Sequence, residues 1–73
     1  MAERSDEIKK LIAVATDMVL PNNVRIDTIK HMTKIGSREA FLALLELAAN
    51  DQLIKKERDL ALKQAREILK SER

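Results

Sequence analysis

The sequence predicts an all-α protein of four antiparallel helices that form a single domain over residues 1–73. Three observations lead to this prediction. Apolar residues recur at steps of three and four along nearly the whole chain, which places them on one face of a helix. The alternation of apolar and polar residues that marks a half-buried strand is not evident. The chain has one glycine and one proline, and each stands where one helical pattern stops and the next begins.

The first helix is expected from Ser5 to Leu20. Ser5 is suited to cap its N-terminus, and Asp6 and Glu7 follow in the first turn, where the helix dipole favours acidic residues. Pro21 ends the helix because it has no backbone N–H to donate. The face predicted to be buried comprises Ile8, Leu11, Ile12, Ala15 and Val19, with Val14 and Met18 beside it.

The second helix is expected to start at Asn22 and Asn23, which can cap it, and to run to about Ile35. Gly36 follows as a residue that takes the left-handed conformation easily, as a helix C-terminus often requires. The predicted inward face comprises Val24, Thr28, Ile29, Met32 and Ile35.

The third helix is expected from Arg38 to Ala49, with Ser37 as its N-cap. Apolar residues occupy well over half of its circumference, which is typical of a central helix contacted by several neighbours. The residues predicted at the centre of the core are Phe41, Leu44, Leu45 and Ala48.

Asn50 and Asp51 are expected to end the third helix and to cap a fourth, from about Gln52 to Ser71. The predicted inward arc of the fourth helix comprises Ile54, Ala61, Leu62, Ala65, Ile68 and Leu69.

The chain also contains an internal repeat with a period of 33 residues. Residues 4–36 align with residues 37–69 without a gap, and apolar character is kept on the inward faces. Such a period is typical of stacked helix pairs. The identical pairs are Leu11 with Leu44, Ala15 with Ala48, Leu20 with Leu53, Arg25 with Arg58, Lys30 with Lys63, and Ile35 with Ile68.

Part of each repeat resembles the second helix of a HEAT-type repeat. In the first, Asn23, Val24 and Arg25 open the helix, and apolar residues follow to Ile35 and Gly36. The second repeat continues the scheme with Arg58, Ala61, Leu62, Ala65 and Ile68. The resemblance covers about residues 4 to 70 and implies two stacked HEAT-like repeats. The alternative is a plain four-helix bundle in which the period is accidental.

Composition argues against most catalytic chemistry. The chain lacks cysteine, and Gly36 is its only glycine, so neither a thiol site nor a glycine-rich phosphate loop is expected. His31, the only histidine, has no second ligand at metal spacing and is interpreted as a surface residue. We therefore expect no enzyme activity, no cofactor and no metal.

Charge and hydropathy predict a cytoplasmic protein. The formal net charge is +2, which is ordinary for a small soluble domain. No apolar run approaches the roughly 20 residues that a membrane span needs. The charged N-terminal segment does not resemble a signal peptide.

Arg25 and Arg58 lie in the first turns of the second and fourth predicted helices. Arg58 projects within an otherwise apolar arc. A partly buried guanidinium needs hydrogen-bond acceptors, so both arginines are interpreted as structural clamps to helix-end carbonyls or a carboxylate. The alternative is contact with a bound anion in a groove.

The fourth predicted helix carries a basic stripe that could contact phosphates. Asp59 and Glu67 interrupt the stripe at spacings of four residues from lysine, which favours a solvated, salt-bridged face. The predicted pairs are Lys55–Asp59, Asp59–Lys63 and Lys63–Glu67. The stripe consists of Lys55, Lys56, Lys63, Arg66, Lys70 and Arg73.

Together these observations predict a small, non-catalytic protein-binding or assembly module. Ile26 and Leu60 are apolar residues on polar helix faces, which makes them candidate contacts. Nucleic-acid binding along the basic stripe is the alternative function. Self-association is also expected, since two repeats leave both end surfaces open, with Val14, Met18 and Leu60 outside the main apolar faces. The candidate partner contacts are Ile26, Lys30, Leu60, Lys63, Arg66 and Lys70.

Overall fold

The computed structural model describes the backbone of residues 2–71 and the side chains of residues 6–71. This part of the chain forms four α-helices and no strand, which confirms the predicted all-α fold. The helices are α1 (Ala2–Ala15), α2 (Asn22–Ile35), α3 (Arg38–Ala48) and α4 (Lys55–Ser71).

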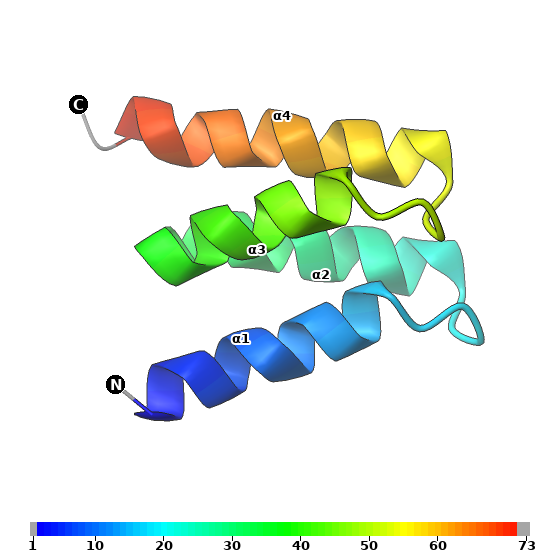
Figure 1. Ribbon diagram of the computed structural model, residues 1–73, viewed down its shortest axis with the longest axis horizontal. Coiled ribbons are helices and arrows are strands. Elements are labelled where there is room, and N and C mark those ends of the chain that lie inside the picture. The colour runs from blue at the N-terminus through cyan, green and yellow to red at the C-terminus, as the bar shows by residue number, and fades with distance from the viewer. Residues whose placement is uncertain (1, 72–73) are drawn as a thin grey trace.

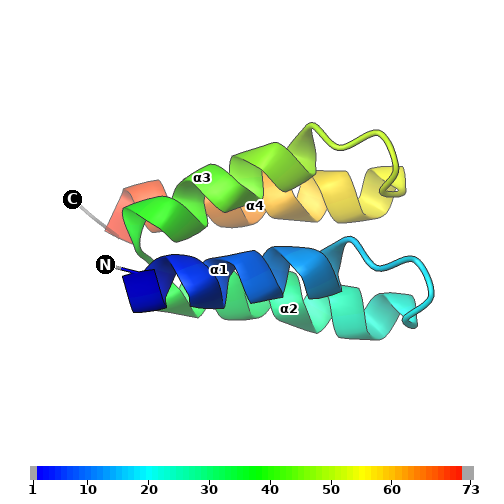
Figure 2. The ribbon, with the colours of Figure 1, turned by 60° about the horizontal axis from the view of Figure 1, so that its bottom comes forward.

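Successive helices run in opposite directions (Figure 1). α1 packs against α2, and α3 packs against α4, which is the most extensive contact between helices. The two pairs lie one upon the other, with α1 beside α3 and α2 beside α4 (Figure 2). The loops that join α1 to α2 and α3 to α4 therefore lie at the same end of the molecule.

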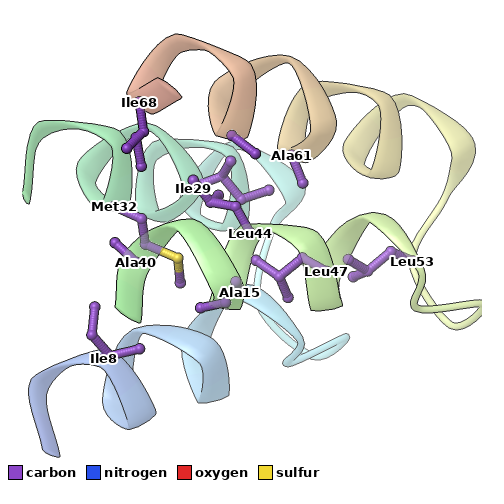
Figure 3. Close-up of a cluster of buried hydrophobic side chains, with 12 residues drawn as sticks. Ile8, Ala15, Ile29, Met32, Ala40, Leu44, Leu47, Leu53, Ala61 and Ile68 are labelled. Carbon is purple, nitrogen blue, oxygen red and sulfur yellow. The ribbon is translucent and has the colours of Figure 1, made fainter. Parts of the chain in front are cut away.

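The core lies between the two pairs of helices (Figure 3). Leu44 and Leu47 of α3 are fully buried, as are Ile29 and Met32 of α2. Small residues allow the backbones to approach closely. The buried apolar residues are Ile8, Ala15, Ile29, Met32, Ala40, Ala43, Leu44, Leu47, Leu53, Ala61, Ala65 and Ile68.

The structure corrects part of the predicted core. Of the four residues placed at its centre, only Leu44 is fully buried, whereas Phe41 and Ala48 are partly buried and Leu45 is exposed. Of the predicted inward arc of the fourth helix, Ile54, Leu62 and Leu69 are exposed, and Ile54 lies in the loop before α4. No other described helix covers the outer side of the α3–α4 pair, so Leu45, Leu62 and Leu69 remain partly exposed to solvent.

Two predicted capping positions between α2 and α3 are confirmed. Gly36 has a φ of 64° and its N–H donates to the carbonyl of Met32. The hydroxyl of Ser37 accepts from the N–H of Ala40 at 3.1 Å. The predicted asparagine cap of α2 is wrong, since the helix begins at Asn22 directly after Pro21 without a side-chain cap.

Two predicted helix boundaries beside the long loops are also wrong, the end of the first helix and the start of the fourth, whereas α3 ends at Ala48, within one residue of the expected end. α1 begins at Ala2 and ends at Ala15, so it starts before Ser5 and stops well short of Leu20. Val19 lies in the loop and is 92% exposed. α4 begins at Lys55, three residues later than expected.

Both long loops contain the same local structure, which explains why the helices stop early. The side chain of Asp17 accepts from the N–H of Val19 at 2.9 Å, and that of Asn50 accepts from the N–H of Gln52 at 2.8 Å. Such side-chain acceptors compete with helical hydrogen bonds and favour a turn. The two turns are 33 residues apart, which matches the period of the sequence.

None of the helices described here has both the length and the apolar character needed to cross a membrane.

Candidate functional site

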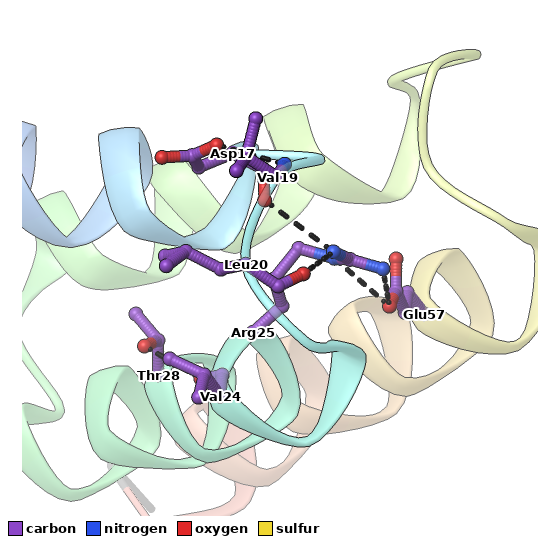
Figure 4. Close-up of polar contacts among 7 residues, drawn as sticks. All are labelled: Asp17, Val19, Leu20, Val24, Arg25, Thr28 and Glu57. Atoms are coloured by element: carbon purple, nitrogen blue, oxygen red, sulfur yellow. Dashed lines mark hydrogen bonds and ion pairs between the residues drawn. The ribbon is translucent and has the colours of Figure 1, made fainter.

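A buried ion pair joins α2 to α4 (Figure 4). The Nε and Nη2 atoms of Arg25 donate to Oε2 of Glu57 at 3.0 and 2.8 Å. Nη1 of the same guanidinium donates to the carbonyl of Leu20 at 2.6 Å and to that of Asp17 at 3.3 Å. Arg25 therefore holds the α1–α2 loop and the start of α4 together.

Both members of this pair are inaccessible to a ligand. Glu57 is completely buried and Arg25 is 6% exposed. Arg25 thus occupies the position of a clamp between helices. The predicted carboxylate acceptor is present in Glu57, whereas the carbonyls that accept belong to the α1–α2 loop instead of a helix end. This geometry leaves no room for an anion in place of Glu57.

Sequence reasoning did not assign Glu57 to Arg25. The signal that could have done so is spacing, because Glu57 stands four residues before Ala61 and eleven before Ile68, on the inward stripe of α4. A charged residue on such a stripe needs a buried partner of opposite charge. In the described part of the chain, the second carboxylate oxygen of Glu57, Oε1, has no hydrogen-bond partner.

Arg58 stands where the repeat places the counterpart of Arg25, but its surroundings differ. Its side chain is 35% exposed, and Nη1 lies 3.9 Å from the carboxylate of Asp51. Its Nε atom is buried and has no hydrogen-bond partner among the described residues. The two arginines therefore occupy the same position in each repeat, but the guanidinium of Arg25 has its hydrogen-bond acceptors and that of Arg58 lacks one for Nε.

A shallow groove of about 340 Å³ lies between α2 and α4 on the surface of the molecule. Its apolar lining includes Ile26 and Leu60, both half-buried. The structure thus brings four of the six predicted partner contacts to one place and leaves Arg66 and Lys70 outside it. The lining residues are Ile26, Lys30, Lys56, Asp59, Leu60 and Lys63.

The position of Leu60 differs from the expectation that it lies outside the core. Leu60 packs partly against the buried cluster, because the neighbouring helix α2 covers one side of it. Met18, the other residue proposed for self-association, is in the α1–α2 loop and is 43% exposed. The two residues belong to different elements and do not share the α2–α4 groove.

The α2–α4 groove is positively charged. Lys30, Lys56 and Lys63 are exposed around it. Asp59 is the only acidic residue among those that line the groove, and its carboxylate already accepts from Lys55 at 3.0 Å. A ligand in the groove therefore meets an apolar floor with three lysines at its margin.

The basic stripe of α4 is exposed at its described positions, and Arg73 lies outside the described residues. The predicted pair between Lys55 and Asp59 is present. Glu67 pairs with Lys70 at 4.0 Å, instead of with Lys63 as the spacing suggested. The stripe is thus partly neutralised at each end.

His31 lies on α2 and is exposed. Among the described residues, no group of three His, Cys, Asp or Glu side chains is placed to hold a metal ion.

Comparison with models of protein families, with curated proteins and with solved structures finds no match to this chain. The function is therefore argued from the geometry of the chain itself.

Proposed function

We propose that the chain is a non-catalytic, HEAT-like repeat module that binds an acidic protein segment in the α2–α4 groove. One observation carries the proposal. The groove combines two half-buried apolar side chains, Ile26 and Leu60, with three exposed lysines. An apolar floor with charge at its margin suits a partner that inserts one large apolar side chain and presents carboxylates beside it.

The apolar and the charged residues of the groove have different roles, which follow from how far each is buried. Ile26 and Leu60 are already partly withdrawn from water, so a partner that covers them removes apolar surface from water without breaking hydrogen bonds. Lys30, Lys56 and Lys63 remain solvated and would mainly speed association and select the sign of the partner's charge.

The repeat assignment is supported by the two long loops. Asp17 and Asn50 make the same contact to the N–H two residues ahead, and Leu20 and Leu53 each donate a backbone hydrogen bond to them, at 3.1 Å in both loops. Two segments that share a sequence period and a loop geometry are best explained as copies of one helix pair.

Nucleic-acid binding is the second candidate, because the described basic residues of the α4 stripe are all exposed. It has less support. Phe41, the only aromatic residue, is half-buried and packs against the core, so no described side chain offers a stacking platform for bases. The stripe also contains Asp59 and Glu67, which carry the opposite charge.

Selection of random peptides on the immobilised chain tests the proposal. We expect enriched peptides to carry Asp or Glu around one large apolar residue. Their binding should shift the backbone amide signals of Ile26 and Leu60 in the ¹⁵N-labelled protein. The variant Leu60→Ser should weaken binding, whereas Val19→Ser, which changes an exposed loop residue, should not.

Random-sequence duplex DNA serves as the competing probe. If DNA binds more tightly than any selected peptide, and if its affinity falls steeply with salt, the basic stripe is the functional surface and the proposal is wrong. If selected peptides lack acidic residues or shift amides elsewhere, the assignment of the groove is wrong.

A further inference from the structure

The outer side of the α3–α4 pair, the α3–α4 face, is apolar and uncovered by any described helix. Helical spacing places two stripes on it, one from each helix. The α3 stripe is Arg38, Leu42 and Leu45, and the α4 stripe is Arg58, Leu62, Arg66 and Leu69. A groove of about 190 Å³ separates the stripes near the start of α3, and its lining comprises Arg38, Phe41, Leu42, Ile68 and Leu69.

The same residue types are buried in the first helix pair. Leu62 stands 33 residues after Ile29, which is completely buried, yet Leu62 is 40% exposed. Arg58 stands 33 residues after Arg25. Arg25 has Glu57 as its acceptor, whereas Nε of Arg58 is buried without one. The α3–α4 face thus carries the residue types of the α1–α2 surface that α3 and α4 cover, but no described helix covers it.

A second copy of this chain, stacked head to tail, does not supply a carboxylate at the position that Glu57 takes against Arg25. Glu57 is the third residue of α4, and the third residue of α2 is Val24. In α1, the repeat places Glu7 and Lys10 where α3 has the buried Ala40 and Ala43. Those positions would therefore present charges where the internal interface has small apolar side chains.

A two-fold pair of α3–α4 faces is also unfavourable. Arg38 and Arg66 are exposed on this face, and Arg58 is half-exposed at its end. Two such faces in contact would bring together arginines from both copies, and like charges across an interface oppose association. Charge complementarity instead favours a partner that places a carboxylate opposite Arg58.

We propose that the α3–α4 face is a docking surface for a helix pair of a partner protein. The partner's apolar side carries small residues and a carboxylate that accepts from the terminal nitrogens of Arg58, whose side chain is 35% exposed. One large apolar side chain of the partner fills the groove beside Phe41 and Leu42. This surface is separate from the α2–α4 groove, so the two proposals can fail independently.

The test uses a probe with this chemistry, a synthetic peptide copy of residues 37–71. In the intact chain, the same segment covers α1 and α2 and pairs Glu57 with Arg25. The full-length ¹⁵N-labelled protein is titrated with the unlabelled peptide. We expect saturable shifts at the amides of Leu45, Arg58 and Leu62.

Matched variants separate docking from non-specific association. A peptide with Glu57→Gln should bind at least about tenfold more weakly, because the guanidinium would be desolvated without a charged acceptor. The protein variant Leu62→Lys should abolish the shifts. Val19→Lys, at an exposed apolar residue away from this face, should leave them unchanged.

Three results would overturn the proposal. The first is the absence of shifts at about 1 mM peptide, which corresponds to negligible affinity. The second is a set of shifts that extends to the buried residues of α1 and α2, such as Ile29 and Met32, which would mean that the peptide exchanges with the chain's own α3 and α4. The third is a dimer of the full-length protein in sedimentation equilibrium that Leu62→Lys dissociates, which would make a second copy the occupant.

Discussion

Replacement of Glu57 by leucine isolates the contribution of the buried ion pair. The change removes the charged acceptor of Nε and Nη2 of Arg25 but leaves that guanidinium buried. The contacts of Nη1 to the carbonyls of Leu20 and Asp17 remain. Loss of one partner from a buried pair costs about 3–5 kcal/mol, because the remaining charge has no counterion.

This loss is large for a chain of 73 residues. At about 0.05–0.15 kcal/mol per residue, its free energy of unfolding is about 4–11 kcal/mol. We therefore expect the melting temperature of Glu57→Leu to fall by at least about 12 °C. The double variant Arg25→Met with Glu57→Leu should recover most of the loss, because no unpaired charge is then buried.

Urea denaturation followed by far-ultraviolet circular dichroism measures both effects. The control is Asp59→Asn, which removes a carboxylate two residues away whose ion pair with Lys55 is exposed. That change should cost less than about 1 kcal/mol. The reasoning is refuted if Glu57→Leu costs no more than this control, or if the double variant is as unstable as the two single changes added together.

Three further changes test the core and the helix ends. Leu44→Ala should cost about 2–5 kcal/mol and broaden the thermal transition, since the side chain is fully buried; Leu69→Ala, at an exposed leucine, should cost far less in the same calorimetric scan. Gly36→Ala should cost about 1 kcal/mol in urea denaturation, because φ is 64° while the added Cβ meets only ordinary contacts; an unchanged midpoint would mean that this conformation is not required. Ser37→Ala should lower the free energy of unfolding by about 1 kcal/mol through loss of the bond to Ala40, and Ser37→Asp should retain it.

The candidate site was partly predictable from the sequence. Ile26 and Leu60 were predicted as partner contacts because they are apolar residues on polar helix faces. The structure places them in one groove with Lys30 and Lys63. Lys56 and Asp59 were not anticipated in that lining. Their inclusion depends on how far α4 is displaced along α2, which helical periodicity does not contain.

The α3–α4 face also shows that helical periodicity does not reveal where the neighbouring helices lie. Leu45, Leu62 and Leu69 lie on apolar arcs and were expected to point inward, yet all are exposed. An arc wider than one neighbouring helix can cover leaves some of its residues in water. Which residues those are depends on where the neighbouring helices lie.

Helix type, number and several helix ends follow from signals within four or five residues. Local backbone geometry determines the left-handed conformation of Gly36, the cap at Ser37 and the spacing of apolar residues. These features can therefore be predicted from the sequence. The pair between Arg25 and Glu57 joins residues 32 positions apart. Such a contact forms only when two packed helices bring both side chains into the same dry region, so tertiary packing alone decided which buried charges are paired and which leucines remain exposed.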